Sequence, residues 1–285
     1  MLFKRNTPCP TPKDTDTPVQ LIEVHKAFGS LVVLDGITLE VQRGQTTVVL
    51  GPSGAGKSVI LRHIVGLIRP DKGSVYLLGC CIDKMSEQQL KSMRARVGFL
   101  FQLSALFDSM TIEENLAFPL TERTSTPRAE RKRRIAQALS IVDLKGVEKK
   151  MPAHLSGGQK KRAALARALM LKPEVMLYDE PTTGLDPIRA AEIDQLINKT
   201  KEELGVTSIV VTHDMESASH IADRAVLLDE GRILADGAME DLYACAHPRV
   251  QAFLSGGGAR QRLQQNAEQR AQALAKLTTP SETGT

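Results

Sequence analysis

A glycine-rich segment near the start of the chain has the spacing of a phosphate-binding loop. It consists of Gly51, Pro52, Ser53, Gly54, Ala55, Gly56, Lys57 and Ser58. Glycine conformations let backbone N–H groups converge on phosphate oxygens, and the following helix points its positive end at them. We expect Lys57 to reach the β- and γ-phosphates of a nucleoside triphosphate and the Ser58 hydroxyl to bind Mg²⁺.

Two adjacent carboxylates, Asp179 and Glu180, follow an apolar run at 175–178. In α/β proteins, ligands bind at the carboxyl ends of the strands. Asp179 is therefore expected to hold Mg²⁺, directly or through water, and Glu180 to polarise the attacking water. Such a pair alone could be a polar loop, but beside a phosphate-binding loop it favours triphosphate hydrolysis.

A parallel sheet is needed to bring these residues together. The alternation and apolar runs predict strands at 19–24, 37–41, 46–50, 175–178 and 208–211, and a closing hairpin over 225–233. Helices are predicted at 59–68 and 188–204, and the mostly helical stretch 86–144 looks like an insertion. Strands that alternate with helices indicate an α/β fold.

The overall composition narrows the class of protein. Apolar residues make up 42% and charged residues 25% of the 285, which is ordinary for a globular protein. The balance of 37 basic against 33 acidic residues is too mild to predict nucleic-acid binding. No segment approaches the roughly 18 apolar residues of a membrane span, so another chain must hold the protein at any membrane where it works.

Further motifs make the chain similar to the nucleotide-binding subunits of ATP-binding cassette (ABC) transporters, over residues 19–254. The matching positions are Ser156, Gly157, Gly158 and Gln159 in the signature motif, Gln102 in the Q-loop, Asp186 in the D-loop, His213 as the switch histidine and Phe28 against adenine. The family commonly has Tyr where this chain has Phe28, but stacking needs only the ring. The bound nucleotide is then expected to be ATP.

The resemblance implies a P-loop NTPase (RecA-like) core with an antiparallel β subdomain and a helical subdomain inserted at about 103–160. Residues 1–18 are expected to be a disordered tail, and 255–285 a partly helical or disordered extension with Leu263, Ala267, Leu274 and Leu277 loosely on one side of a weak helix.

The family's mechanism assigns roles to the matching residues. Glu180 and His213 would be catalytic, and Gln102 would sense Mg²⁺ and the permease. The signature residues would contact ATP bound to the opposite subunit, so that two ATP molecules are sandwiched in a head-to-tail homodimer.

A narrower resemblance concerns the cargo. The segments 99–111, 115–120, 151–154 and 247–254 are similar to the ATPase of the bacterial phospholipid-trafficking (Mla, MCE-associated) transporters. This implies a permease, an MCE-type lipid-binding subunit and a small accessory subunit as partners, with the chain peripheral at the cytoplasmic face of the inner membrane. Leu103, Leu106 and Phe107 are either permease-docking residues or simply core of the helical subdomain.

Three other functions are weighed against this one. The ATPase of a polar amino-acid importer shares the Q-loop frame. An ABC protein that acts on nucleic acid could use the basic run 128–134, but this run precedes apolar residues at helical spacing and is better interpreted as a solvated helix face. We therefore expect no direct nucleic-acid partner. A P-loop kinase would leave the signature motif unexplained.

Overall fold

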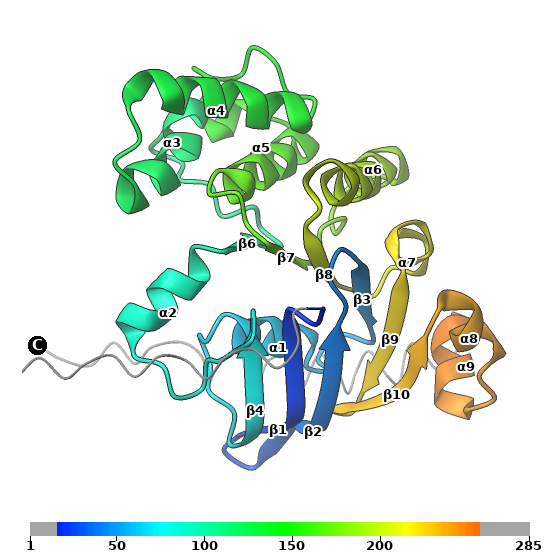
Figure 1. Ribbon diagram of the computed structural model, residues 1–285. Helices are drawn as coiled ribbons and strands as arrows, with labels where there is room; N and C mark the ends of the chain where they lie inside the picture. Colours follow the sequence, from blue (N-terminus) through cyan, green and yellow to red (C-terminus); the bar gives the residue numbers. More distant parts are fainter. Residues whose placement is uncertain (1–15, 257–285) are drawn as a thin grey trace, which may run out of the picture.

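A six-stranded sheet forms the centre of the part of the chain that the computed structural model describes, residues 16–256 (Figure 1). Its strands, in spatial order, are β10 (Arg232–Gly237), β9 (Arg224–Asp229), β3 (Thr46–Leu50), β8 (Thr207–Thr212), β7 (Val175–Asp179) and β6 (Val97–Leu100). Neighbouring strands are parallel except β10, which pairs with β9 as an antiparallel hairpin. The carboxyl ends of the five parallel strands therefore share one edge.

A second, antiparallel sheet has four strands. In spatial order they are β2 (Leu31–Val41), β1 (Val19–Phe28), β4 (Lys72–Leu77) and β5 (Cys80–Cys81). Helix α1 (Lys57–Ile64) contacts both β4 of this sheet and β7 and β8 of the larger one. The phosphate-binding loop, which leads into α1, thus lies between the two sheets.

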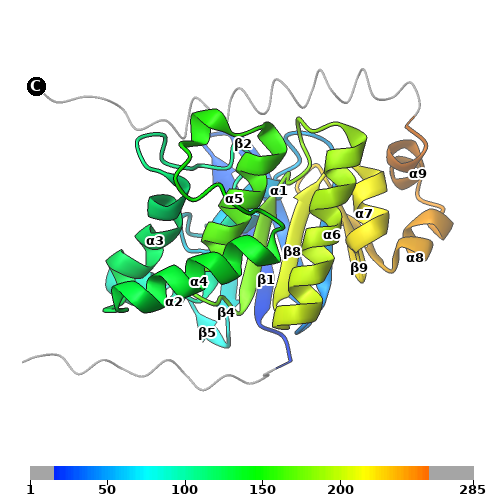
Figure 2. The ribbon, with the colours of Figure 1, turned by 90° about the horizontal axis from the view of Figure 1, so that it is seen from above.

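Most of the remaining helices cover the outer face and the ends of the large sheet, but the helix over 87–94 contributes Leu90 and Met93 to the core on the side of α1 (Figures 1 and 2). They are α2 (Glu87–Arg94), α3 (Ile112–Arg123), α4 (Arg128–Ile141), the 3₁₀ turn η1 (Pro152–His154), α5 (Gly157–Leu169), α6 (Pro187–Leu204), α7 (Met215–Ile221), α8 (Met239–Ala244) and α9 (Pro248–Leu254). Helices α3, α4 and α5 pack together as a separate group, α6 and α7 lie side by side, and α8 and α9 lie beside the β9–β10 hairpin.

Alternation along the central strands divides the core into two clusters. In β3, Val48 and Leu50 join the cluster beneath the outer helices, whereas Val49 joins the cluster shared with α1 and the antiparallel sheet. Successive side chains of a strand point to opposite faces, and a parallel sheet covered on both faces needs apolar residues on each. All five residues of β3 are buried accordingly.

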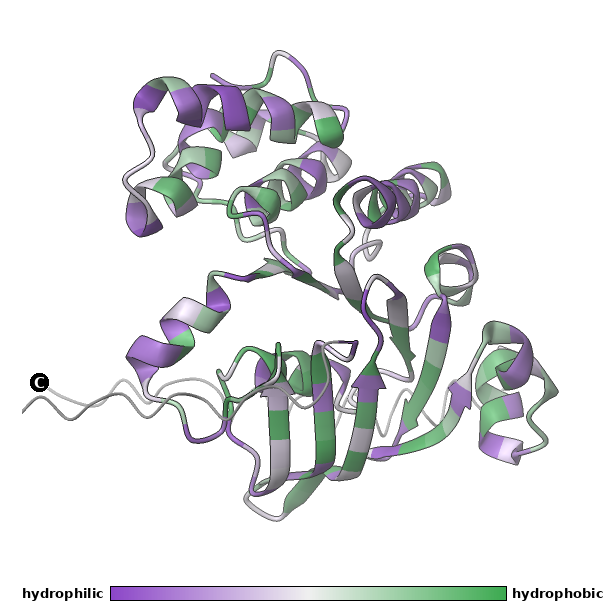
Figure 3. Ribbon diagram, viewed as in Figure 1, coloured by the Kyte–Doolittle hydropathy of each residue, from purple (hydrophilic) through white to green (hydrophobic). Residues whose placement is uncertain are grey.

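Helix α4 shows why its basic run does not predict a nucleic-acid site. Ile135, Ala138 and Leu139 are buried, while the basic side chains lie on the polar outer face seen in Figure 3. Two of the arginines, Arg133 and Arg134, form ion pairs with Glu130 on the same helix. The solvated-face interpretation of the run is confirmed.

The predicted helix 59–68 has different bounds in the structure. Helix α1 begins at Lys57, because Gly56, with a φ of 106°, provides the N-cap directly after the loop. It ends at Ile64, since Gly66 has a φ of 64° and the left-handed region terminates helices. The predicted strands at 19–24 and 37–41 are likewise parts of longer strands, β1 and β2.

The prediction that 86–144 is mostly helical was wrong at 97–100, which form strand β6. This strand pairs in parallel with β7, with Phe99 opposite Leu177. A four-residue apolar run carries no period that separates a buried strand from a helix. No strand was predicted at β4 or β5; β4 (72–77) pairs with β1 and with β5, and β5 (80–81) is the edge strand of the antiparallel sheet.

Parts of both predicted tails lie outside the described residues, namely 1–15 and 257–285, which include the proposed weak helix. Residues 16–18 of the expected tail are ordered. Thr17 is buried, and the carbonyl of Pro18 accepts a hydrogen bond from the Leu78 N–H at 2.6 Å. Within 16–256, no helix combines the length and apolar character that crossing a bilayer requires.

Asn115 fastens the segment that follows β6 to the helical group. Its side chain is fully buried, its amide donates to the carbonyls of Phe107, Met110 and Thr111, and its oxygen accepts the N–H of Phe107. Four backbone groups of one irregular segment thus depend on a single side chain.

We expect Asn115→Leu to lower the free energy of unfolding by about 2–4 kcal/mol, because it leaves buried polar groups without hydrogen-bond partners and fills no void. Urea denaturation followed by circular dichroism measures this change. Asn198→Leu is the matched control, since the Asn198 amide makes one exposed bond to the His220 carbonyl. Equal losses in the two variants would contradict this account of Asn115.

Candidate functional site

The phosphate-binding loop connects β3 to α1 and depends on two close backbone approaches. Gly51 has a φ of 154°, and a Cβ there would lie 2.1 Å from the Leu228 carbonyl oxygen. A Cβ on Gly56 would lie 2.9 Å from a Leu34 methyl group. Only glycine fits at these positions, so β9 and β2 support the loop from outside. Gly54 has a φ of 81°, which also favours glycine.

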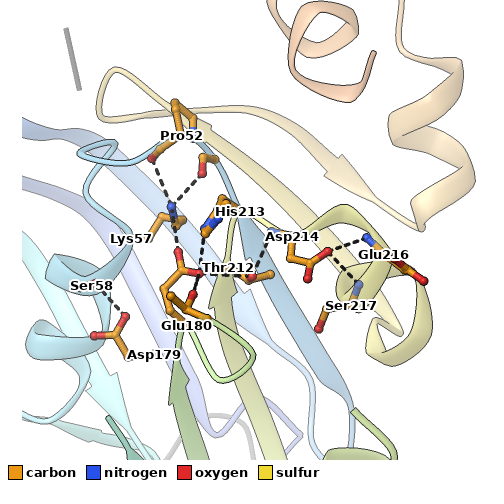
Figure 4. Close-up of polar contacts among 12 residues, drawn as sticks. Pro52, Lys57, Ser58, Asp179, Glu180, Thr212, His213, Asp214, Glu216 and Ser217 are labelled. Carbon is orange, nitrogen blue, oxygen red and sulfur yellow. Dashed lines mark hydrogen bonds and ion pairs between the residues drawn. The ribbon is translucent and has the colours of Figure 1, made fainter. Parts of the chain in front are cut away.

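Lys57 points back into the loop (Figure 4). Its ammonium donates to the carbonyls of Gly51 at 2.7 Å and Pro52 at 3.1 Å, and lies 3.4 Å from a carboxylate oxygen of Glu180. The side chain is 6% exposed, and burial lowers the pKa of Lys57. A buried cation enclosed by a glycine-rich loop is an arrangement that can bind an anionic phosphate chain.

Ser58 and Asp179 face each other across the start of α1 and the end of β7. The Ser58 hydroxyl donates to an Asp179 carboxylate oxygen at 2.8 Å. Burial raises the pKa of Asp179, and the neighbouring Glu180 charge raises it further. Hydroxyl and carboxylate oxygens are the ligand types that Mg²⁺ takes in sites that also use phosphate oxygens. The donor set therefore fits that ion.

Glu180 follows β7 with its backbone in the left-handed region, at a φ of 48°. Its carboxylate receives hydrogen bonds from Thr183 at 3.2 Å and Thr212 at 3.4 Å, in addition to its contacts with Lys57 and His213. Burial alone would raise its pKa, but the His213 hydrogen bond and the Lys57 charge outweigh burial and lower the pKa of Glu180. The carboxylate is therefore ionised at neutral pH.

His213 lies directly after β8, the strand next to β7. Its Nδ1 is 2.9 Å from a Glu180 carboxylate oxygen, and this hydrogen bond raises the pKa of His213 above its ordinary 6.5. The raised pKa means that the pair stabilises the fold fully below about pH 6.5. That contribution is lost as the pH rises through the higher folded value.

An NMR titration of the histidine ring protons should therefore place the pKa of His213 above 6.5 in the nucleotide-free protein. In Glu180→Gln, loss of the carboxylate should return this pKa toward 6.5 or below, because burial then acts without its opposing partner. His247, which caps α9 and is not among the residues that contact Glu180, is the internal control. An unchanged His213 pKa in the variant would contradict the pairing.

The signature residues lie at the N-terminus of α5, away from the group around Lys57. Ser156 caps the helix by accepting the N–H of Gln159, and the Gln159 side chain accepts the N–H of Ser156 in return. Ser156 and Gly157 are exposed. Among residues 16–256, no hydrogen bond or ion pair joins these residues to the phosphate-binding loop of the same chain. The positive end of α5 instead faces outward.

The D-loop lies beside the signature residues. Asp186 caps α6 by accepting the N–H of Arg189 at 3.1 Å. A Cβ on Gly157 would be 3.8 Å from a methyl group of Leu185, and one on Gly158 would be 3.5 Å from the Arg189 side chain. Two motifs that are distant in sequence thus form one exposed surface.

Gln102 and Phe28 do not take part in the hydrogen bonds around Lys57. Gln102 is exposed two residues after Leu100, which pairs with Tyr178 of β7, so Gln102 and Glu180 leave neighbouring strands at the same edge. Phe28 ends β1, and the Lys26 ammonium lies 5.5 Å from the centre of its ring.

Three residues around Glu180 were missed by sequence reasoning. Thr183 and Thr212 donate to its carboxylate, and Lys161 donates to its carbonyl at 3.2 Å. Thr212 immediately precedes His213, which was a usable signal. Lys161 lies inside the signature helix and had no signal of its own.

The sequence of this chain is similar to those of known proteins. Residues 34–183 match the family of ABC transporters. The chain is 41% identical, over 84% of its own length and 88% of the relative's, to the intermembrane phospholipid transport system ATP-binding protein MlaF of Escherichia coli. It is also 38% identical, over 85% of its length and 75% of the relative's, to the chloroplastic protein TRIGALACTOSYLDIACYLGLYCEROL 3 of Arabidopsis thaliana.

A third relative has a different name. The chain is 41% identical to a probable ribonucleotide transport ATP-binding protein, mkl, of Mycobacterium leprae, over 81% of its own length and 67% of the relative's. The corresponding share is 64% for the Mycobacterium tuberculosis protein. The chain thus spans about two thirds of the length of these mycobacterial relatives.

Solved structures share the fold. The cassette cbiO1 from Clostridium perfringens, part of a transporter complex, aligns with a TM-score of 0.75 at 30% identity, covering 80% of this chain and 91% of that one. The cassette MJ0796, solved as a dimer bound to ADP and phosphate, aligns with a TM-score of 0.72 at 33% identity, covering 78% of this chain and 98% of that one.

Proposed function

This chain belongs to the ABC transporter family as one of its ATPases, and we propose that it powers the transport of phospholipid between the inner and outer membranes of a bacterium. The observation that carries the proposal is the 41% identity to MlaF, which extends over nearly the full length of both chains. The plant relative, whose name contains that of a glycerolipid, supports the same cargo.

The residues around Lys57 would carry out the hydrolysis. Lys57 would exchange its loop carbonyls for the β- and γ-phosphates of ATP, and Ser58 and Asp179 would hold Mg²⁺, with Gln102 beside them. That ion supplies charge neutralisation at the phosphates when it is bound. Glu180 would orient and polarise the attacking water, with His213 holding the carboxylate in place, and Phe28 would stack on adenine.

The second half of each site would come from another copy of the chain. Ser156 and Gly157 are exposed at a helix N-terminus that can bind phosphate, with Gln159 half-buried and Gly158 buried beside them. No described contact joins these four residues to their own loop. A head-to-tail homodimer would place them on the partner's ATP. Asp186, beside them, would line the same interface.

A permease would dock on the segment that follows Gln102. Leu103 is 90% exposed, and Phe101 and Phe107 are 40% and 41% exposed. Leu106 packs against the core instead. With no described helix able to cross a bilayer, attachment to the cytoplasmic face of the inner membrane would depend on this permease. An MCE-type lipid-binding subunit and a small accessory subunit would complete the complex, without nucleic acid.

Two rival cargoes keep the same ATPase chemistry. Ribonucleotide transport is favoured by the mycobacterial relatives, whose identity of 41% equals that of MlaF but whose chains extend well beyond the match. A polar amino acid is the other alternative, from the shared Q-loop frame. The match with MlaF covers most of both chains, which favours phospholipid as the cargo.

An allele encoding Glu180→Gln in the source bacterium tests the cargo. We expect phospholipid to accumulate in the outer leaflet of the outer membrane and sensitivity to detergent to increase, with uptake of labelled ribonucleosides and polar amino acids unchanged. Unchanged outer-leaflet lipid together with defective uptake of either solute would overturn the lipid proposal and leave the ATPase assignment intact.

A further inference from the structure

Lys161 is a buried cation that the proposed hydrolytic mechanism does not use. Its side chain is 5% exposed. Its ammonium donates to the main-chain carbonyl oxygen of Glu180 at 3.2 Å, and among residues 16–256 no carboxylate lies within 4.0 Å of it. Burial lowers the pKa of Lys161 to about 8, and the Glu180 charge offsets part of this effect. A lysine without a close counter-ion is a costly residue to bury, so a specific contact must favour it.

The carbonyl that Lys161 holds belongs to a strained residue. Glu180 has a φ of 48°, which is unfavourable for a residue with a side chain. Its N–H donates to the Val211 carbonyl at 2.9 Å, and its carbonyl accepts the Lys161 ammonium and the N–H of Thr183 at 3.3 Å. The two peptide groups that set the direction of the Glu180 side chain are therefore fixed on both sides.

The lysine reaches this carbonyl from the signature helix. Lys161 follows Ser156, the N-cap of α5, by five residues, or ~7.5 Å along the helix axis. The same helix thus presents its exposed end outward and its buried lysine to the Glu180 main-chain carbonyl of its own chain. No other described side chain donates to the Glu180 carbonyl.

We propose that Lys161 is a positioning residue that holds the Glu180 backbone in the conformation needed for hydrolysis. This inference rests on the proposed role of Glu180 in polarising water. Without the lysine, the Glu180 backbone can leave the left-handed region, and its carboxylate no longer points at the attacking water. Lys57 and the phosphate-binding loop remain able to bind ATP.

The test compares Lys161→Met with the wild-type full-length chain in steady-state ATP hydrolysis, with thermal melting of each protein. Methionine fills the volume of the lysine stem but has no donor. We expect kcat to fall 10- to 50-fold while KM for ATP changes less than twofold. Lys161→Arg, which restores a donor, should recover kcat to within about threefold. Should the methionine variant not fold, Lys161→Gln takes its place. The glutamine side chain is one bond shorter than lysine and does not reach the Glu180 carbonyl, so the same loss of kcat is expected.

Two controls make the outcome decisive. Lys199→Met removes an ammonium that contacts Asp143 at the surface and should leave kcat unchanged. Glu180→Gln reports on the premise, because full activity in that variant removes the proposed role of Glu180 itself. With Glu180→Gln inactive, a normal kcat in Lys161→Met would overturn the inference about Lys161 alone. A rise in KM as large as the fall in kcat would do the same, since it would mark a general structural defect.

Discussion

Replacing Glu180 by glutamine is expected to lower ATP turnover on the order of 10²–10³-fold, because the neutral amide carries no negative charge and cannot accept a proton from the attacking water. Glutamine has nearly the same volume, so the loop around Lys57 keeps its shape. The substitution also removes the carboxylate 3.4 Å from the Lys57 ammonium, which frees that cation for phosphate. ATP affinity should therefore be unchanged or higher.

Phosphate release measures the turnover, and titration with a fluorescent ATP analogue measures the affinity. Glu174→Gln is the matched control, because Glu174 forms a half-exposed ion pair with Arg96 and its loss should change turnover less than twofold. A Glu180→Gln variant that hydrolyses ATP at the wild-type rate would show that another group activates the water.

Gly157→Asp should abolish ATP-driven dimerisation and lower turnover on the order of 10²-fold, while the single chain keeps its stability. The new carboxylate would stand at the exposed end of α5, where it favours the helix by about 0.3–1 kcal/mol. In a head-to-tail dimer it would face the phosphates of the partner's ATP, and like charges at such distances repel by several kcal/mol. A Cβ fits here, since its nearest neighbour is 3.8 Å away.

Light scattering with saturating ATP, in the Glu180→Gln background that retains the nucleotide, measures dimerisation, and thermal melting measures stability. Gly157→Ala separates charge from size and should retain more dimer than Gly157→Asp. A dimer of normal affinity in Gly157→Asp would place the signature residues outside the interface.

The sequence was most informative where residue type and spacing reflect one chemical task. The loop from Gly51 to Ser58, the pair at Asp179 and Glu180, and His213 were all identified before the structure, and the structure places them within one group of contacts. The loop and the carboxylate pair were placed at the ends of predicted strands, which predicted that they lie at one edge of the sheet. His213 was assigned through the resemblance to the family.

Other features depend on tertiary contacts that no local pattern encodes. Strand β6 is four residues long, and its partner β7 lies far along the chain, so pairing rather than periodicity makes it a strand. Helix α1 stops early because Gly66 is left-handed where Leu90 packs closely against it. The bond from Lys161 to the Glu180 carbonyl joins two motifs through a main-chain atom, which residue spacing cannot reveal.

The most direct test of the phospholipid proposal is to purify this ATPase with its membrane partners in mild detergent and reconstitute the complex between donor and acceptor vesicles. The proposal predicts ATP-dependent movement of labelled phospholipid, abolished by Glu180→Gln, in a complex that contains a permease and a lipid-binding subunit. ATP hydrolysis that moves no phospholipid but is stimulated by an amino acid with its binding protein, or by a ribonucleotide, would contradict it.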